Sequence, residues 1–330
     1  MYTSLPQKFQ IRNNCIISYQ DYSYLDSSKT KKREEKPIII QSGTYTESAK
    51  KRLKKCLDIW TYSYAGLDVQ FSFITLTISS KYKSEIDYYT YLKQFIEIIT
   101  YRYKNVNYAW KLELQENGNP HYHLLFDTEI QWKSVRKQWN KIQSIHVDEY
   151  QIKMKSKYKN GYYFDNTMVD KNGNTVSEEI QEKRFKIGYK ANWRNPNSTD
   201  VKIENNLEAV QKYISKYINK TENENKTITY NSNRWCGTSD SLKLIKYATI
   251  EEISTDVETL QKLSQCCTKI IEKENRYICT IHDKINTETI RYAEQKTIEE
   301  NRKILHINQI QLNEKLIKKD AETYTKLFEK

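Results

Sequence analysis

The chain has 330 residues, of which 38% are hydrophobic and 29% are charged, a composition that supports a folded core and excludes a wholly disordered protein. It carries 54 Lys and Arg against 42 Asp and Glu, a formal charge of +12. This balance favours a polyanionic partner such as a nucleic acid, although a lysine-rich surface alone would give the same number. The chain shows no apolar leader, no membrane-length apolar run and no C-x-x-C pair among its six cysteines, so we expect no membrane attachment, zinc site or disulfide framework.

Residues 1–36 are polar and end in the charge run KTKKREEK, which is typical of a flexible arm. After this arm, β-branched runs and the helical spacing of apolar residues predict a series of elements. In chain order they are a short strand at 37–41, a basic helix at 46–62, a strand at 71–79, a helix at 83–103, strands at 107–115 and 121–127, a helix at 130–145, a helix at 205–220, and short strands or turns at 227–250. Residues 155–200 are rich in Tyr, Asn, Lys and Gly, which predicts a long loop or hairpin insertion.

From about residue 251 onward, helix formers dominate and Gly and Pro are missing, which predicts a C-terminal region of two or three helices. The order strand, helix, strand, strand, helix in the preceding part predicts an α+β fold, with helices packed on an antiparallel sheet. We therefore expect an arm at 1–36, a central domain at 37–250 and a helical region at 251–330. No G-x-x-x-x-G-K-[ST] motif occurs, so no P-loop ATPase is fused to the chain.

The strongest chemical signal is the segment YAWKLELQENGNPHYHLLFD at 108–127. His121 and His123 project from one face of their strand, because side chains alternate between the two faces. If the loop spans residues 116–120, Gln115 lies opposite His121 and Glu113 opposite His123, so one face carries all four side chains. The other face then forms a core of Trp110, Leu112, Leu114, Tyr122, Leu124 and Phe126.

Two imidazoles and one carboxylate suit Mg²⁺, Mn²⁺ or another first-row cation, with positions left open for phosphate oxygens. The alternative is a half-exposed sheet with a polar outer surface, which explains Glu113 and Gln115 more easily than the histidines. The strand at 71–79 divides its side chains in the same way: Thr75 and Thr77 would flank the metal face. Together with Gln115, these threonines are candidates for contact with DNA, although threonine is common in strands for other reasons.

Residues 210–220, VQKYISKYINK, contain two Y-x-x-K units in tandem. On a helix Tyr213 and Tyr217 share a face, with Lys216 beside Tyr213 and Lys220 beside Tyr217. A neighbouring ammonium favours the phenolate and offsets charge on a phosphate, as attack by a tyrosine requires. The apolar residues of the same segment also form an ordinary amphipathic stripe, so a purely structural helix is the alternative.

Together these segments resemble the HUH replication initiators, above all those of microviruses, with the gene-two-type replication proteins of filamentous phages as relatives. The likeness rests on F-I-T-L-T at 73–77, E-x-Q-x-x-G-x-P-H-x-H at 113–123 and Y-I-S-K-Y-I-N-K at 213–220, which occur in the order of the family. A looser likeness is N-R-W-C-G-T-S at 233–239 to a W-G-x-S segment, which Cys236 interrupts. The resemblance covers about residues 70–245.

The resemblance implies a ferredoxin- or RRM-like domain with the H-x-H on a middle strand and the tyrosine helix alongside. It implies a divalent cation, Mg²⁺ or Mn²⁺, held by His121, His123 and an acidic residue, for which we take Glu113. Tyr213 or Tyr217 would nick single-stranded origin DNA, leaving a 5′-phosphotyrosine and a free 3′-OH for rolling-circle replication. The second tyrosine would later help to rejoin the ends, and Lys216 and Lys220 would supply positive charge.

The partners that this interpretation implies are single-stranded origin DNA, a host helicase and a DNA polymerase. The expected location is the cytoplasm, that of the bacterial host if the chain is encoded by a phage. Two alternatives stay open: a related single-tyrosine transposase or relaxase, and a non-catalytic protein that binds single-stranded nucleic acid. The sequence does not choose between Mg²⁺ and Mn²⁺, and it gives neither the origin sequence nor the oligomeric state.

Overall fold

The structure is a computed structural model, and it describes residues 7–12, 15–20, 46–115, 118–170, 173–206, 209–210, 212, 234–251, 257–265, 267–273, 277–283 and 286–306. The chain divides into two compact units. One contains Ser42–Lys50 and Val69–Thr238, and the other contains Met1–Gln41, Lys51–Asp68 and Ser239–Lys330. Each unit combines helices with a five-stranded antiparallel sheet, so the expected α+β class is confirmed.

The sheet of the first unit has the strand order β6-β3-β5-β4-β7. Its strands are β3 (Phe71–Thr77), β4 (Tyr108–Leu114), β5 (Pro120–Phe126), β6 (Thr199–Glu204) and β7 (Cys236–Thr238). The three strands expected between residues 71 and 127 are confirmed, with ends that differ by one or two residues. The H-x-H strand β5 is central, because β3 and β4 pair with its two edges.

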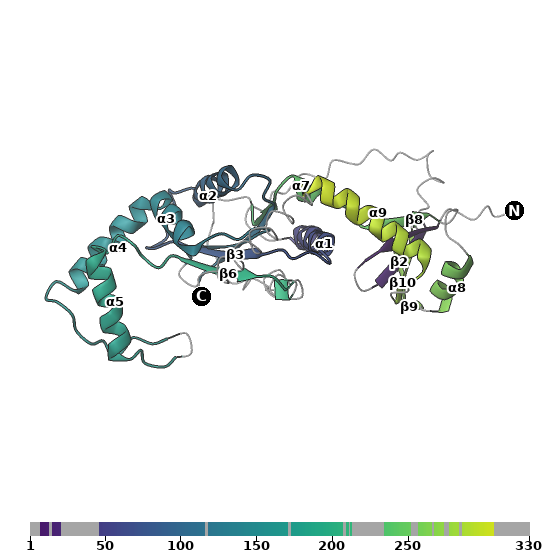
Figure 1. The fold of residues 1–330 in the computed structure, drawn as a ribbon. Coiled ribbons are helices and arrows are strands. Elements are labelled where there is room, and N and C mark those ends of the chain that lie inside the picture. Colours follow the sequence, from purple (N-terminus) through teal and green to yellow (C-terminus); the bar gives the residue numbers. More distant parts are fainter. Residues whose placement is uncertain are drawn as a thin grey trace, which may run out of the picture. The chain divides into compact units, whose positions relative to one another are not determined.

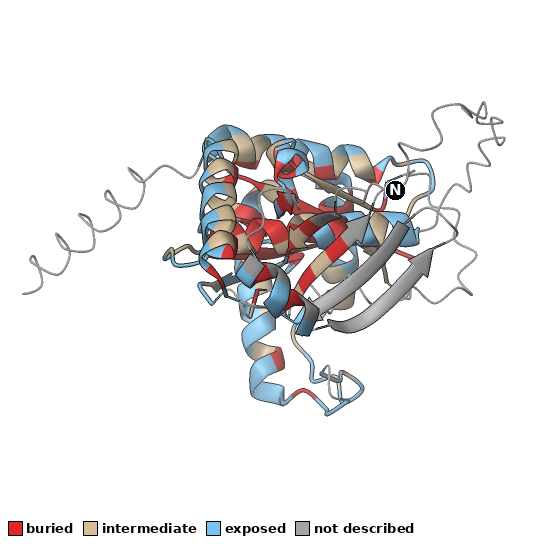
Figure 2. Cartoon of the chain, turned by 90° about the vertical axis from the view of Figure 1, so that its right-hand side faces the viewer, coloured by how far each residue is buried: buried red, intermediate tan, exposed pale blue. Residues whose placement is uncertain are grey.

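Helices α2 (Tyr88–Arg102) and α3 (Trp132–Ile142) cover one face of this sheet (Figure 1). Trp139 of α3 is fully buried, and its ring lies edge-on to Phe95 of α2 at 6.0 Å and to Tyr122 of β5 at 6.4 Å. Figure 2 shows buried residues along the strands and the helix faces that meet them. The expected core face is confirmed, because all of its members except the partly buried Leu114 are buried: Trp110, Leu112, Tyr122, Leu124 and Phe126.

Helix ends depend on local capping and on distant contacts. Helix α2 begins later than the expected residue 83, because the Asp87 carboxylate caps it by accepting a hydrogen bond from the Tyr89 amide at 3.0 Å. The single helix expected at 130–145 is two helices, α3 and α4 (Ser144–Lys157), with Gln143 between them. The buried Gln143 amide holds this break, since its oxygen accepts from the Ser79 amide at 2.9 Å.

The loop or hairpin expected at 155–200 is wrong for much of its length, because Glu178–Lys190 form helix α5 and residues 199–204 form β6. Acidic residues in the first turn of α5 and a lysine in its last turn complement the helix dipole. The aromatic residues of this segment pack on one another: Tyr158 stacks on Trp193 at 5.2 Å and meets Phe185 at 4.9 Å. These contacts order a polar segment whose composition resembles that of a loop.

The second unit has a sheet of order β8-β1-β2-β10-β9. Its strands are β1 (Gln7–Ile11), β2 (Cys15–Gln20), β8 (Ala248–Glu251), β9 (Cys267–Lys273) and β10 (Tyr277–Asp283). Its helices are most of α1 (Glu47–Ser63), and α7 (Ser241–Leu244), α8 (Val257–Gln265) and α9 (Glu288–Ile304). The basic helix expected at 46–62 is confirmed as α1.

Two expectations fail in this unit. The flexible arm at 1–36 is wrong for β1 and β2, and the helical region at 251–330 is wrong for β9 and β10. The reason is long-range pairing, because β1 pairs with β8 and β2 with β10 to bury Phe9, Ile11, Ile16 and Ile250 in one core. The strand expected at 37–41 lies outside the described residues, and no helix within them is both long and apolar enough to cross a membrane.

A polar cluster around the buried His146 joins α4 to the loop that follows β3. The Ser80 hydroxyl donates to the Glu149 carboxylate at 2.6 Å and lies 2.7 Å from Nδ1 of His146. Because that hydroxyl hydrogen is used, His146 donates through Nδ1, while its Nε2 is buried without a hydrogen-bond partner. Burial lowers the pKa of His146, with Lys83 acting in the same direction and Glu149 and Glu85 against it.

This cluster predicts a pH-dependent stability. The folded-state pKa of His146 lies below its unfolded value, so as pH falls through about 6.5 the unfolded chain takes up a proton that the folded chain does not. Stability is therefore lost on acidification. We expect His146→Asn to flatten the pH dependence of the free energy of unfolding, measured by urea denaturation between pH 7.5 and 5.5, by at most about 1.4 kcal/mol per pH unit. Tryptophan fluorescence follows this unit, which holds five of the six tryptophans: Trp110, Trp132, Trp139, Trp193 and Trp235.

The matched control is Val147→Ala, which removes methyl groups from the buried neighbour of His146 and leaves the imidazole in place. It should lower stability and keep the pH dependence of the wild type. A variant lacking His146 that loses stability on acidification as steeply as Val147→Ala would contradict the prediction.

Candidate active site

The β4–β5 hairpin places Glu113 opposite His121. We expected Gln115 opposite His121 and Glu113 opposite His123, so the expected register is wrong by two residues. The cause is the loop, which is two residues shorter than expected because the Gln115 amide donates to the Asn119 carbonyl at 2.9 Å. A shift of two residues preserves the face of every side chain, so the expected polar face survives the error.

Two rows of side chains cross this face of the sheet. One row consists of Cys236, Lys111, His123, Thr75 and Asp200 on β7, β4, β5, β3 and β6. The other row consists of Glu113, His121 and Thr77 on β4, β5 and β3. The sheet therefore brings together all the strand residues expected at the site, with Gln115 Nε2 3.5 Å from His121 Nδ1.

Both imidazoles turn Nδ1 toward the threonines of β3. His121 Nδ1 lies 3.0 Å from Thr77 Oγ1, and His123 Nδ1 lies 3.5 Å from Thr75 Oγ1. On the other side, His123 Nε2 lies 3.1 Å from a carboxylate oxygen of Glu113, and the two imidazole rings are 4.7 Å apart. The two rows thus orient the rings, with β3 on the Nδ1 side and β4 on the Nε2 side of His123.

Burial changes along this face. Phe73, Ala109, Lys111 and Leu125 are buried at one end, and His123 is 9% exposed. Toward the hairpin loop the side chains become partly exposed: Thr75, Thr77, Glu113, Gln115 and His121. The imidazoles stand where the closed part of the face meets the open part, so a ligand can approach from the loop end while charges at the closed end are shielded from water.

The donor set suits a divalent cation. Two imidazole nitrogens and a carboxylate oxygen are common ligands of first-row cations, and a threonine beside Nδ1 holds the ring and can accept a proton from Nδ1 when Nε2 binds a cation. The 3.1 Å between His123 Nε2 and Glu113 matches the spacing of about 3.0 Å between adjacent ligands of a small octahedral cation. Across the described residues, no three His, Cys, Asp or Glu side chains yet converge as a ligand group, so His121 would have to move toward the pair.

The tyrosine segment lies outside the described residues. This applies to all four of its expected catalytic residues: Tyr213, Lys216, Tyr217 and Lys220. Residues 209, 210 and 212 are helical, and Val210 is fully buried, at the place where the helix expected at 205–220 begins. The roles of the two tyrosines stay predictions.

Sequence reasoning missed two charged residues of this face. Lys111 is only 4% exposed and lies opposite His123, where its charge bears directly on the site. Its position two residues before Glu113 was a usable signal, because the two share a face. Asp200 lies opposite Thr75 at the edge strand. Nothing local indicated Asp200, since its place depends on the pairing of β6 with the distant β3.

The looser motif around residue 235 forms the other edge of the sheet. The Trp235 carbonyl accepts from the Leu112 amide at 2.8 Å, and Gly237 pairs with Trp110 of β4. A Cβ atom on Gly237 would lie 2.6 Å from the indole Nε1 of Trp110, so the indole fills the space that any other residue would need.

The comparisons with known proteins agree with part of this picture. Residues 71–222 match the family described as replication-associated protein ORF2/gene-2 protein, a range that holds the H-x-H strand and the tandem tyrosines. A comparison with curated proteins finds no significant match. Among solved structures, the chain is similar to the hypothetical protein ORF119 from Sulfolobus islandicus rod-shaped virus 1, at 19% identity over 52% of this chain and 97% of that chain, with a TM-score of 0.25. A TM-score that low carries no conclusion, whereas the family match supports a replication initiator.

The contact between Gly237 and Trp110 predicts a strong and specific mutational effect. We expect Gly237→Ala to lower the free energy of unfolding by about 1–3 kcal/mol, because the added methyl group overpacks against the indole. In a Trp110→Leu background the same change should cost much less, since the smaller side chain leaves room. Urea denaturation of the four proteins gives the coupling. Additive costs in this cycle would contradict the close approach.

Proposed function

We propose that this chain is a replication initiator that nicks single-stranded origin DNA by a metal-assisted attack of tyrosine on a phosphodiester. The observation that carries the proposal is the pair of imidazoles beside a carboxylate on the central strands, with His123 Nε2 3.1 Å from Glu113. This arrangement lies within the range that matches a family of replication-associated proteins. The imidazoles and the carboxylate have no role in a protein that only binds nucleic acid.

In this proposal His121, His123 and Glu113 hold Mg²⁺ or Mn²⁺. When bound, the cation polarises the scissile phosphate and lowers the cost of the negative charge that develops on it. The two threonines orient the imidazoles: metal binding through Nε2 requires the proton on Nδ1, where Thr77 and Thr75 can accept it. This role differs from the DNA contact that the sequence suggested for these threonines.

The reaction exchanges one phosphodiester bond for another. The phenol oxygen of Tyr213 or Tyr217 loses its proton and attacks phosphorus, and the bond from phosphorus to the 3′ oxygen breaks. The leaving oxygen takes up a proton to become the free 3′-OH, and the 5′ phosphate stays on tyrosine. Because the phosphotyrosine conserves the bond energy, rejoining by the reverse reaction needs no nucleotide cofactor.

The covalent product gives the direct test. A randomised single-stranded DNA pool labelled at its 3′ end should yield a denaturant-resistant labelled protein with Mn²⁺, and sequencing the captured strands would reveal the preferred site. The same pool labelled at its 5′ end should give only free DNA fragments. We expect EDTA, His123→Ala or the double variant Tyr213→Phe/Tyr217→Phe to reduce the adduct at least about 100-fold.

An adduct that persists in the double tyrosine variant would overturn the assignment of the nucleophile. The single variants separate the initiator from a one-tyrosine relaxase or transposase. In an initiator that uses both residues, each single variant should keep at least one strand-transfer step. If one single variant loses every step and the other loses none, the chain is a one-tyrosine enzyme.

Metal binding can be tested without DNA. Isothermal titration with Mn²⁺ should show one site, which His123→Ala or Glu113→Ala abolishes. Thr77→Val removes the oxygen beside His121 Nδ1 and should weaken binding about tenfold, whereas Thr77→Ser keeps that oxygen and the affinity. Equal affinities for the valine and serine variants would show that Thr77 does not orient the ligand.

A further inference from the structure

A stripe of basic side chains runs along the outside of α3. Lys133, Lys137 and Lys141 recur at intervals of four residues, and Arg136 lies three residues after Lys133, so the four share one side of the helix. The opposite side of α3 packs into the core through Val135 and Trp139. Lys133, Lys137 and Lys141 are exposed and face away from the core, whereas Arg136 contacts the segment before β6 through Asn197. The imidazoles lie on the sheet face that the helix layer does not cover.

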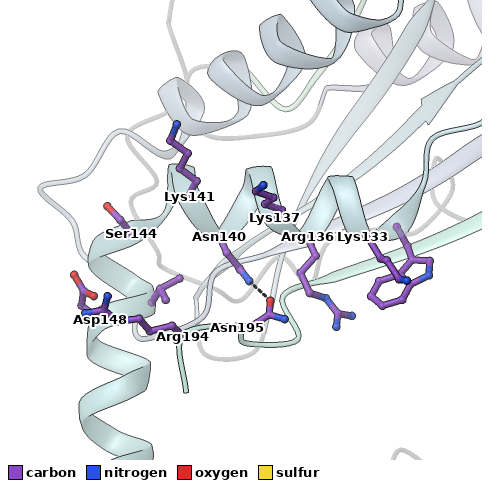
Figure 3. A pocket seen from close by; sticks show the side chains of 11 residues that line it. Lys133, Arg136, Lys137, Asn140, Lys141, Ser144, Asp148, Arg194 and Asn195 are labelled. Carbon is purple, nitrogen blue, oxygen red and sulfur yellow. Dashed lines mark hydrogen bonds between the residues drawn. The ribbon is translucent and has the colours of Figure 1, made fainter. Parts of the chain in front are cut away.

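The stripe forms one wall of a groove of about 590 Å³ (Figure 3). The first turns of α4 and the segment Arg194–Asn195 complete it. Its cationic side chains are Lys133, Arg136, Lys137, Lys141 and Arg194, and its acidic side chain is Asp148. Over the residues that the structure describes, no ion pair joins any of these cations to a carboxylate. A groove of this volume accommodates a ligand of nucleotide size.

Hydrogen bonds hold the walls of the groove together. The Asn140 amide donates to Asn195 Oδ1 at 3.1 Å and to the Pro196 carbonyl at 3.2 Å, while the Ser198 hydroxyl donates to Asn140 Oδ1 at 2.5 Å. Arg136 adds a hydrogen bond to the side chain of Asn197, and its Nε is buried without a partner. The groove is therefore fixed before a ligand arrives.

An exposed tryptophan lines the groove. Trp132 is 49% exposed, although tryptophan has the largest side chain of the twenty amino acids. Arg136 lies 4.9 Å and Lys133 5.8 Å from the centre of its ring, in cation–π contact. An aromatic face beside a row of cations is the combination that binds single-stranded nucleic acids, because a base stacks on the ring while the cations contact phosphates.

We propose that this groove is a second DNA-binding site, which holds a single-stranded segment flanking the nick site by contacts to its phosphates and by stacking of a base on Trp132. Single-stranded DNA fits better than a folded acidic protein, because a run of cations at helical spacing matches a continuous backbone and the ring matches an unpaired base. The proposal rests on the proposed function for the identity of the DNA, but the groove and the imidazole face are separate and can fail separately.

The test is fluorescence anisotropy with a labelled 20-mer of oligo(dT), in EDTA so that the imidazole face holds no cation and no cleavage occurs. We expect Lys137→Ala/Lys141→Ala to reduce the slope of log K against log salt by about 1.4, since each lost phosphate contact contributes about 0.7 on single strands. Trp132→Ala should weaken binding about fivefold or more. Replacing one thymine by 5-iododeoxyuridine should give a photocrosslink to the peptide that contains Trp132.

The matched control for charge is Lys153→Ala/Lys155→Ala, which removes two exposed lysines of α4 outside the groove. The matched control for the ring is Tyr101→Ala, because Tyr101 is also exposed and lies on α2. Both controls should bind like the wild type. Equal losses in the groove variants and their controls, or a crosslink that avoids Trp132, would overturn the proposal. A groove that binds while no adduct forms would instead count against the nickase alone.

Discussion

The antiparallel pairing of β5 with β3 and β4 is the constraint on which the site depends. This pairing sets two imidazoles between a pair of threonines and a carboxylate, with the contacts from His121 to Thr77 and from His123 to Glu113 as its direct result. The Glu113 contact runs diagonally across the ladder, because the directly opposite residue is Lys111. A slip by one residue would exchange the polar and core faces, whereas the observed difference of two residues leaves both intact.

The two faces of the sheet and the outer side of α3 carry three different kinds of side chain. The core face carries large apolar side chains that hold α2 and α3 through Trp139. The other face carries the polar rows, which grow more exposed toward the hairpin loop. The outer side of α3 is free to carry cations because its inner side already anchors the helix. In the proposed function, catalysis and DNA binding would thus use different side chains.

Positive charge also differs between the imidazole face and the groove. The buried Lys111 places a positive charge on the imidazole face, two residues before the Glu113 carboxylate. The exposed groove cations Lys133, Lys137, Lys141 and Arg194 repel one another, which costs stability in the absence of a polyanion. A ligand with several consecutive phosphates would neutralise the cations of the groove and relieve this repulsion.

Periodicity within the sequence was enough to predict α1, β3, α2, β4 and β5 and the composition of both sheet faces, because alternation and helical spacing are local properties. The H-x-H, the carboxylate and the two threonines were assigned to one face for the same reason. Local pattern also gave the tandem Y-x-x-K, whose residues lie outside the described part of the chain.

Only the tertiary structure decided the features that depend on partners distant in the sequence. The hairpin register followed from the loop closed by Gln115 and Asn119, and the break between α3 and α4 from the contacts of Gln143. Strands β1, β2, β9 and β10 looked like an arm or helices because their stabilising pairs lie far along the chain. Asp200 and the basic groove joined their sites through folding, since a spacing in sequence fixes a face but does not fix the neighbour across it.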